Sequence, residues 1–512
     1  MSAAPTQSNG PAPLAADAGS ARPVAAPAPA GVALPFAFAR DEQVALEGDL
    51  LLCGPEATAL GLREARRRAG RGLRIENLPL DAYEARLARI YAADSPAEAD
   101  GEDALSFDLE GDEQRGAARD LLEDPTDAPV IRLVNQLLRQ AVRAGASDLH
   151  IEPHEGGLRA RMRVDGTMTQ VLDRADVPAR RVVSRLKVMA SLDIAETRLP
   201  QDGRIALKFG GRAIDLRVST LPGHYGERVV MRLLDRSAGL KTLDRLGLAE
   251  ADSARLRRLA AMPNGVILAT GPTGAGKTTT LYSLLQLADR RERTVLTIED
   301  PVEYDLPGVS QTQVNAEIGL SFAKGLRSLL RQDPDVLLVG EIRDGETAQT
   351  ALEASLTGHL VFSSLHTNTA LTALVRLREL GVEPYLIAAT LRGVVAQRLV
   401  RRVCPSCVQH AAPTAAEAAR FAAADLDAPA RLPRAHGCPA CEGTGYAGRV
   451  GVFDILEIDE ALRGAIEQGG GETLLRQATG RDGAGLIRAG LMRAAAGETT
   501  LDELTRVLGE VG

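Results

Sequence analysis

The stretch from Val266 to Thr279 places the tightest constraint on what this chain can fold into. A run of apolar and β-branched residues at 266–270 leads directly into a glycine-rich turn. A short strand that ends in glycines, then a lysine, a hydroxyl and a helical stretch, is typical of a phosphate-binding P-loop. The predicted nucleotide-binding residues are Gly271, Pro272, Thr273, Gly274, Ala275, Gly276, Lys277, Thr278 and Thr279.

The chemistry of this loop follows from its residue types. Its glycines let successive backbone N–H groups point into one concavity at a helix N-terminus, where phosphate oxygens bind. Lys277 is placed to reach the β- and γ-phosphates, and the Thr278 hydroxyl is a ligand for Mg²⁺. A merely glycine-rich turn explains neither the Lys-Thr pair nor the strand before it. We therefore predict that the chain binds ATP with Mg²⁺.

The region 239–403 around this loop predicts an α/β domain with a largely parallel sheet. Strand-like runs alternate with helical stretches such as 278–287 and 347–356, and this alternation places helices on both faces of a sheet. In such sheets ligands bind at the carboxyl ends of the strands. The predicted strands are 266–269, 295–298, 336–339 and 360–364.

Acidic residues follow two of these strands. Glu299, Asp300 and Glu303 come after the second strand, and three carboxylates near a phosphate site require a cation among them, so Mg²⁺ and its waters are the expected partner. Glu341 follows the third strand, where a carboxylate can polarise the water that attacks the γ-phosphate. The alternative for Glu341 is a plain turn-forming residue. We predict catalytic roles for Glu299, Glu303, Glu341 and Lys277.

Histidines and arginines nearby are further candidates. His359 and His366 bracket the fourth strand, and an imidazole there can bind the γ-phosphate or the catalytic carboxylate; at least one of the pair can instead be structural. Arg327 and Arg331 are four apart on a predicted helix and can present guanidinium groups to phosphate across a subunit boundary. An ordinary salt-bridged face is the alternative interpretation of these arginines.

The rest of the chain divides by composition. Residues 1–33 are an Ala/Pro-rich tract that we expect to be disordered. Residues 34–93 predict a small domain with a basic helix at 58–69 and a second helix opening at Asp81, whose apolar stripe of Tyr83, Leu87, Ile90 and Tyr91 we assign to the domain's own core. Residues 94–127 contain thirteen acidic and two basic residues and predict a linker.

Residues 128–238 predict a mixed α+β domain. A helical period begins near Ala128, and alternating arginines from 159 to 163 precede an Asp165-Gly166 turn. Further hairpins are signalled by 201–203 and by Gly210-Gly211. Several arginines fall on its predicted strands, where solvated edge positions are the commoner explanation.

Four of the five cysteines form two Cys-x-x-Cys pairs within the predicted insertion 404–450. Each pair can supply two thiolates to one tetrahedral Zn²⁺, and with four protein ligands such a site is structural. The pairs stand thirty residues apart, more than usual, so His410 and His436 are possible substitute ligands. The predicted zinc ligands are Cys404, Cys407, Cys438 and Cys441. Residues 451–512 predict a helical C-terminal domain.

Composition excludes several classes of protein. A net charge of −8 and an aromatic content of 3% argue against a general nucleic-acid binder. Cysteines in Cys-x-x-Cys pairs fit a reducing compartment. The sequence has no run of about eighteen apolar residues, and we expect a cytoplasmic protein that reaches a membrane only through partners.

Several motifs together resemble the secretion ATPase superfamily, and within it the type II secretion ATPases of the general secretory pathway. The resemblance covers residue 128 to the C-terminus and, more loosely, 34–93. It is carried by 199–204 (LPQDGR), 226–228 (GER), the P-loop, 299–303 (EDPVE), 311–315 (QTQVN), 330–335 (LRQDPD) and 357–360 (TGHL).

This resemblance implies a RecA-like ATPase domain preceded by a PAS-like domain, assembled as a homohexamer. By motif match, Arg217 and Arg232 would contact phosphate from the PAS-like domain, and Arg327 and Arg331 from the ATPase domain. It also implies that Glu341 is the catalytic Walker B glutamate, 299–303 an aspartate box, and His359 with His366 a histidine box.

The same resemblance implies partners. The N-terminal domain would dock on the cytoplasmic part of an inner-membrane assembly protein, beside an inner-membrane platform protein, and ATP turnover would drive pseudopilus growth and protein export. The membrane association is then peripheral. A pilus-assembly or DNA-uptake ATPase, a nucleic-acid translocase and a non-catalytic nucleotide-binding scaffold are the alternatives.

Overall fold

The computed structural model describes residues 34, 38–39, 42–47, 50–69, 73–80, 82–83, 86–87, 90, 105–107, 128–235, 240–480 and 485–509. The chain divides into two compact units, residues 1–104 and 105–512. The predicted Ala/Pro extension, the capping residue Asp81 and the core residue Tyr91 lie outside the described residues.

The first unit is a three-stranded sheet with one helix. Strands β1 (Val44–Glu47), β2 (Leu50–Cys53) and β3 (Arg74–Asn77) pair in that order, and helix α2 (Ala59–Ala69) packs on β1. The Thr58 hydroxyl accepts the N–H of Gly61 at 3.0 Å, as expected of an N-cap residue. Tyr83 and Leu87 are buried in the unit's core and Ile90 packs against it, so these three residues of the apolar stripe belong to this core as predicted.

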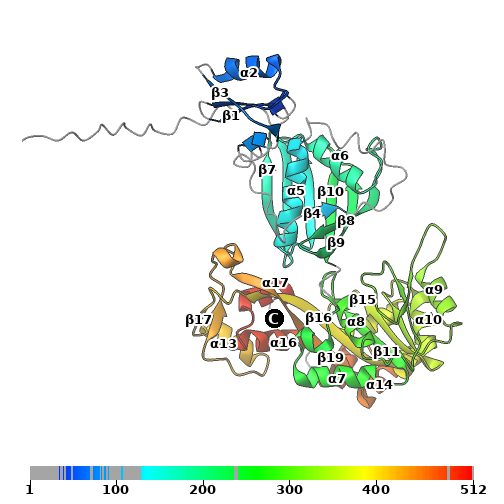
Figure 1. The fold of residues 1–512 in the computed structure, drawn as a ribbon. Helices are drawn as coiled ribbons and strands as arrows, with labels where there is room; N and C mark the ends of the chain where they lie inside the picture. The colour runs from blue at the N-terminus through cyan, green and yellow to red at the C-terminus, as the bar shows by residue number, and fades with distance from the viewer. Residues whose placement is uncertain are drawn as a thin grey trace, which may run out of the picture. The chain divides into compact units, whose positions relative to one another are not determined.

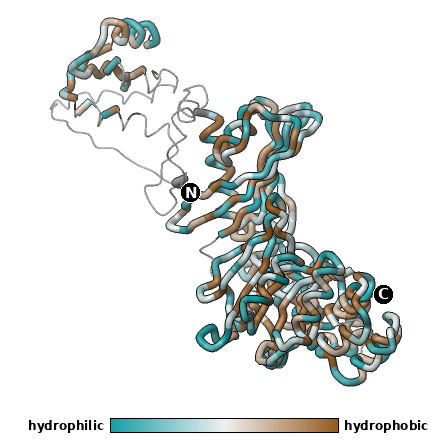
Figure 2. The backbone as a smooth tube through the Cα atoms, turned by 90° about the vertical axis from the view of Figure 1, so that its right-hand side faces the viewer, coloured by the Kyte–Doolittle hydropathy of each residue, from teal (hydrophilic) through white to brown (hydrophobic). Residues whose placement is uncertain are grey.

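Residues 128–235, called the middle domain below, supply all but one strand of a seven-stranded antiparallel sheet with two helices on one face (Figure 1). The strand order is β4-β8-β9-β10-β5-β6-β7. Along β6, buried and half-buried residues alternate, so apolar side chains face the helices and the arginines the other side. Figure 2 shows hydrophobic and hydrophilic residues alternating along the backbone of this domain. The elements are α5 (Ala128–Arg143), β5 (Asp148–His154), β6 (Gly157–Val164), β7 (Thr167–Arg174), α6 (Ala179–Met189), β8 (Gln201–Phe209), β9 (Arg212–Leu221) and β10 (Arg228–Asp235).

Two turns of this domain were predicted correctly and one was not. Asp165-Gly166 and Gly210-Gly211 all have positive φ and close tight hairpins. Residues 201–203, predicted as a hairpin, instead open strand β8, where each pairs with β9. The pairing continues the sheet, so the Asp-Gly signal at 202–203 does not end a strand.

Strand β4 (Leu105–Phe107) lies inside the range predicted to be an acidic linker. It pairs antiparallel with β8 at the edge of the middle domain's sheet. At this point the linker therefore adds a strand to a sheet edge, a form of β-augmentation.

The P-loop domain is a second seven-stranded sheet with helices on both faces, as predicted. Its order is β13-β12-β14-β15-β11-β16-β19, parallel except for the antiparallel pair β16 and β19. Its strands are β11 (Gly265–Thr270), β12 (Val295–Glu299), β13 (Ser310–Gln313), β14 (Val336–Val339), β15 (Leu360–Leu365), β16 (Leu391–Val403) and β19 (Tyr446–Glu457).

Alternate residues of the central strands point to opposite faces of the sheet, and each face has its own hydrophobic core. Ile267 and Ala269 of β11 pack with one set of helices, and Val266 and Leu268 pack with the other. The first face carries η3 (Leu243–Leu246), α7 (Glu250–Ala260) and α8 (Lys277–Leu285); the second carries α9 (Phe322–Leu329), α10 (Gly345–Leu356), α11 (Ala370–Glu379) and α12 (Pro384–Thr390).

The C-terminal residues form the predicted helical tail from Glu460 onward, and this tail packs into the core of the P-loop domain. Residues 451–457 complete β19, which pairs with β16 over most of its length. Apolar residues of the last helices lie in the same core as α10 and α11. These helices are α14 (Glu460–Glu467), α15 (Glu472–Thr479), α16 (Gly485–Ala495) and α17 (Leu501–Leu508).

The predicted zinc insertion lies between β16 and β19. It contains a small antiparallel pair of strands and two short helices. These are β17 (Gln409–Ala411), α13 (Ala415–Ala422), β18 (Leu432–Arg434) and η4 (Pro439–Cys441). Within the described part of the chain, every helix is too short or too polar to cross a bilayer.

Candidate active site

The P-loop turns tightly between β11 and α8 because of its glycines. Gly276 caps α8 in the left-handed region, with φ of 88°. A Cβ on Gly271 would lie 2.6 Å from the carbonyl oxygen of Gln397 on β16, so only glycine fits there. The Gln397 side chain also donates a hydrogen bond to the Ala275 carbonyl at 2.8 Å. Strand β16 therefore packs against the P-loop and holds it in place.

Lys277 is the first residue of α8 and is buried against the loop. Its ammonium donates to the carbonyls of Gly271 at 2.8 Å and Pro272 at 3.2 Å. Burial lowers the pKa of Lys277, an effect that the carboxylate of Glu341 opposes. The other predicted loop residues lie around it: Thr273, Gly274 and Thr278 are exposed, Thr279 is half-buried and Ala275 is buried.

Glu341 lies just beyond the carboxyl end of β14, at the same edge of the sheet as the P-loop. Its carboxylate accepts from His366 Nε2 at 3.1 Å and forms an ion pair with Arg343. The Arg343 guanidinium also reaches Asp300 at 3.4 Å. The structure thus connects Glu341, His366 and Asp300. It adds Arg343, which lies two residues after Glu341 but belongs to none of the predicted motifs.

Glu299, at the end of β12, has a different environment. It is 3% exposed, and its carboxylate accepts hydrogen bonds from three uncharged side chains. The donors are the Tyr282 hydroxyl, the Thr297 hydroxyl at 2.7 Å and the Gln311 amide at 3.1 Å. Gln311 belonged to a recognised motif, whereas nothing in the sequence pattern distinguished Tyr282.

Glu303 connects this edge to the middle domain. Its two carboxylate oxygens accept from Arg217 at 2.9 Å and 3.2 Å, a bidentate pair. Arg217 on β9 stands opposite Arg232 on β10, and Arg232 Nε donates to Asp148 at 3.2 Å. The two predicted phosphate-contacting arginines are therefore neighbours on one sheet face, and Arg217 already reaches the P-loop domain.

Arg327 lies in the last turn of α9, and Arg331 lies two residues beyond the end of this helix rather than on it as predicted. Arg327 forms an ion pair with Glu346, and Arg331 donates to the Arg327 carbonyl at 2.8 Å. Both line an open groove of about 480 Å³ with Lys324 and Ile318. The structure brings these two residues to each other and gives them no contact with Lys277 or Glu341 among the contacts it describes.

His359 lies at the opposite edge of the sheet from the P-loop. It precedes β15, and its carbonyl accepts the N–H of Gly265 at the start of β11. A six-residue strand, about 20 Å long, separates this edge from the carboxyl end of β15, where His366 lies. The Nδ1 atom of His359 contacts the carbonyl of Ala354, near the end of α10, at 2.7 Å. The two histidines bracket the strand as predicted, and the contact of His359 with α10 fits the structural alternative for that residue.

The four predicted zinc ligands converge. Their Sγ atoms all lie within 4.8 Å of one another, and three of the pairs are 3.7 to 3.9 Å apart. A tetrahedron of sulfurs 2.3 Å from a Zn²⁺ has edges of about 3.8 Å. Burial raises the pKa of the Cys441 thiol, but the N–H groups of Cys438 and Gly445 lower it to about 6 overall. His410 and His436 are outside this cluster.

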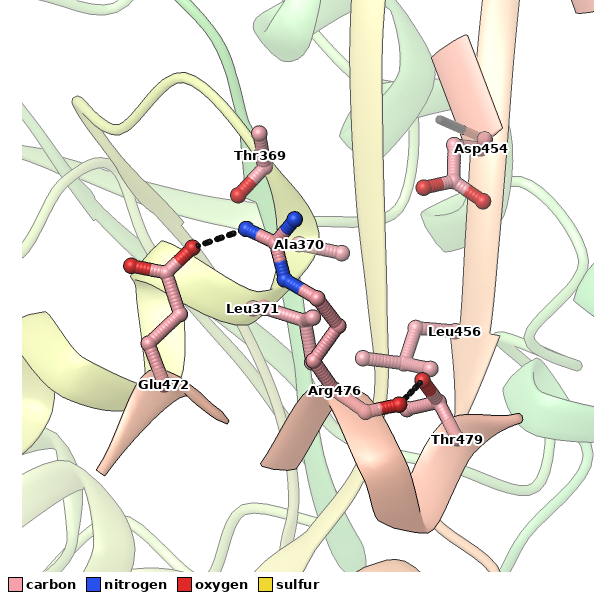
Figure 3. Close-up of a pocket in the computed structure, with 9 residues that line it drawn as sticks. Thr369, Ala370, Leu371, Asp454, Leu456, Glu472, Arg476 and Thr479 are labelled. Carbon is pink, nitrogen blue, oxygen red and sulfur yellow. Dashed lines mark hydrogen bonds and ion pairs between the residues drawn. The ribbon is translucent and has the colours of Figure 1, made fainter. Parts of the chain in front are cut away.

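A separate small pocket lies between β19, α11 and α15 (Figure 3). Its volume of about 30 Å³ has room for no more than about two water molecules. Figure 3 shows Arg476 reaching Glu472, to which it donates at 2.7 Å. The pocket is too small for a nucleotide and shares no residue with the P-loop.

Two family models match this chain, one in each of its two compact units. Residues 123–506 match the family model described as type II/IV secretion system protein, and residues 33–91 match a domain model of GSPII protein E. In solved structures, the fold resembles the ATPase DotB of Legionella pneumophila, with a TM-score of 0.54 and 22% identity over 73% of this chain and 94% of that chain. DotB of Yersinia pseudotuberculosis gives 0.53 and 20% over 74% and 93%. These two likenesses concern the fold.

Sequence relatives are much closer. Type II secretion system protein E of Dickeya dadantii is 47% identical over 93% of this chain and 97% of its own length. The protein of the same name in Pseudomonas aeruginosa is 46% identical over 95% and 98%, and type II secretion system ATPase E of Vibrio cholerae is 44% identical over 93% and 97%. With both family models matched in order and relatives aligned over nearly their full length, the chain belongs to the type II secretion system protein E family of P-loop ATPases.

Proposed function

We propose that this chain hydrolyses ATP to ADP and phosphate to drive pseudopilus assembly and protein export by a type II secretion system. The observation that carries the proposal is that the P-loop with Lys277 and the hydrogen-bonded pair Glu341–His366 lie at the same carboxyl edge of the sheet. Family membership makes the chain an ATPase, and the names of its relatives supply the secretion client.

In this proposal the loop 271–279 holds the phosphates by its backbone N–H groups, with Lys277 at the β- and γ-phosphates. The Thr278 hydroxyl, exposed at the start of α8, is the magnesium ligand. Bound Mg²⁺ would neutralise charge on the phosphate oxygens. Glu341 accepts a proton from the attacking water, and His366 orients the Glu341 carboxylate through their hydrogen bond.

The four predicted arginines would complete the site from outside the P-loop. Arg217 is carried to the edge of the P-loop domain by its pair with Glu303, and Arg232 stands beside it. Arg327 and Arg331 lie in an open groove on α9, where a neighbouring subunit's nucleotide can approach. A homohexamer is the assembly in which each site receives such contacts, so activity should rise with protein concentration.

The four-cysteine cluster fits a structural Zn²⁺. Its sulfur distances match a tetrahedral site, and all four positions are taken by protein ligands, which leaves none for a substrate. The first unit, which matches the domain model of GSPII protein E, is the proposed docking domain for the cytoplasmic part of an inner-membrane assembly protein. The platform protein is a second proposed membrane partner, and the chain would be cytoplasmic and peripherally bound.

The test is ATP hydrolysis by the purified full chain with Mg²⁺, measured over a range of protein concentrations. The expected result is a specific activity that rises with concentration and is lost in Lys277→Ala. A high specific activity independent of concentration would contradict the shared site. Stimulation several-fold by single-stranded DNA would favour the translocase alternative instead.

A further inference from the structure

The carboxylate of Glu299 is held by a side chain of the P-loop helix itself. Tyr282 lies four residues after Thr278, one turn further along α8 on the same face. Its side chain is 2% exposed, and its hydroxyl donates to the Glu299 carboxylate. The helix that follows the P-loop is therefore hydrogen-bonded directly to the end of β12.

The same hydroxyl makes a second contact. It accepts a hydrogen bond from the backbone N–H of Glu303 at 3.4 Å. One oxygen atom thus joins α8 to both ends of the segment 299–303, which carries the predicted aspartate box. Phenylalanine would fill the same apolar space and lose both contacts.

Gln311 on β13 fixes the next part of the chain. Its amide nitrogen donates to Glu299 at 3.1 Å and to the Tyr304 carbonyl at 3.1 Å, and its amide oxygen accepts from the N–H of Leu306 at 2.7 Å. The segment from Glu299 to Leu306 is therefore held at several points by hydrogen bonds to uncharged side chains. Glu303 is the residue of this segment that faces outward to Arg217.

We propose that Tyr282 is a positioning residue for ATP hydrolysis, which couples the P-loop helix to the Glu303–Arg217 contact through its hydroxyl. The inference rests on the proposed function, because it concerns how the middle domain is set relative to the bound phosphates. A small displacement at the start of α8 is transmitted through the hydroxyl to Glu303 and so to the arginine that Glu303 holds. Tyr282 does not contact the reacting atoms in this scheme.

The test compares Tyr282→Phe with Tyr304→Phe in the full chain. Tyr304 packs edge-on to Tyr282, with ring centroids 6.4 Å apart, so it is a matched control for loss of a hydroxyl nearby. Tyr282→Phe should lower kcat about tenfold, the effect of one hydrogen bond to a charged group. The affinity for a non-hydrolysable ATP analogue should change less than twofold. Tyr304→Phe should leave both quantities within twofold of the unsubstituted chain.

A double variant tests the route of the effect. If Tyr282 acts through Glu303, adding Glu303→Gln to Tyr282→Phe should reduce kcat no further than the larger single loss. Multiplicative losses would overturn the proposal. So would an unchanged kcat in Tyr282→Phe, or a joint loss of kcat and nucleotide affinity, which would indicate damage to the P-loop itself.

The outcomes separate this inference from the proposed function. Failure of the unsubstituted chain to hydrolyse ATP at any concentration would contradict both. Hydrolysis by the unsubstituted chain with full activity in Tyr282→Phe would contradict the inference alone.

Discussion

The ends of β12 and β14 carry the same residue type at the same edge of one sheet, and the structure treats them in opposite ways. Glu299 is buried and held by uncharged donors, whereas Glu341 is partly exposed and pairs with Arg343 and His366. A buried carboxylate with its lone pairs taken by fixed donors is suited to holding backbone in place. A carboxylate whose partners are an exposed arginine and an exposed histidine remains accessible to water and phosphate.

The sequence pattern predicts a catalytic role for both Glu299 and Glu341. The structure instead suggests that one carboxylate holds the backbone and the other acts on water. We therefore expect the end of β14 to act on the attacking water, and the end of β12 to hold the backbone that positions Glu303 and Arg217. Variants that keep the size of each side chain can test the assignment.

The largest effect is expected from Glu341→Gln. The substitution keeps the shape of the side chain and removes the base, so kcat should fall about 100-fold or more while nucleotide binding is retained. Steady-state hydrolysis and equilibrium binding of an ATP analogue measure the two quantities. An unchanged rate would make the chain a nucleotide-binding scaffold and remove the basis of the comparison.

Glu299→Gln should act first on stability. Three donors point at this carboxylate. The glutamine side chain would place its own N–H donor against at least one of them, and that pair of donors could not form a hydrogen bond. The expected loss is about 1–3 kcal/mol in the free energy of unfolding of the P-loop domain. Urea or thermal unfolding measures it. Glu346→Gln, at an exposed ion pair with Arg327, should cost less than about 1 kcal/mol and serves as the control.

His366→Ala should have a smaller effect on rate. Loss of one hydrogen bond to the Glu341 carboxylate is expected to lower kcat about tenfold. His359→Ala should change kcat less, because the ring is bound to the end of α10 at the opposite edge of the sheet. Equal losses in the two variants, measured side by side, would show that edge position does not decide a histidine's role.

The smallest effect on kcat is expected at the four-cysteine cluster. Cys441→Ser should lower the zinc content from about one ion per chain, as measured by atomic absorption. The long pairing of β16 with β19 does not depend on that ion, so kcat should change less than about twofold. A loss of hydrolysis as large as that of Glu341→Gln would mean that the insertion sets the order of the P-loop edge.

The fold was predicted well where local pattern is decisive. Four strands of the P-loop sheet and the Asp165-Gly166 hairpin were found from the sequence because periodicity and turn chemistry act over a few residues. Strand β19 was missed because its partner β16 is separated from it by the whole insertion. The hairpin predicted at 201–203 was wrong because pairing with β9 overrode an Asp-Gly signal.

The sequence by itself determined the phosphate loop, the acidic strand ends and the four cysteines, since each depends on residue types at short spacing. Only the tertiary structure decided which acid is buried, which histidine shares the edge with the P-loop, and that Tyr282, Gln311 and Arg343 belong to the site. The physical reason is that burial and hydrogen-bond partners come from strands and helices distant in the chain. A carboxylate's surroundings, more than its place in a motif, then decide what it can do.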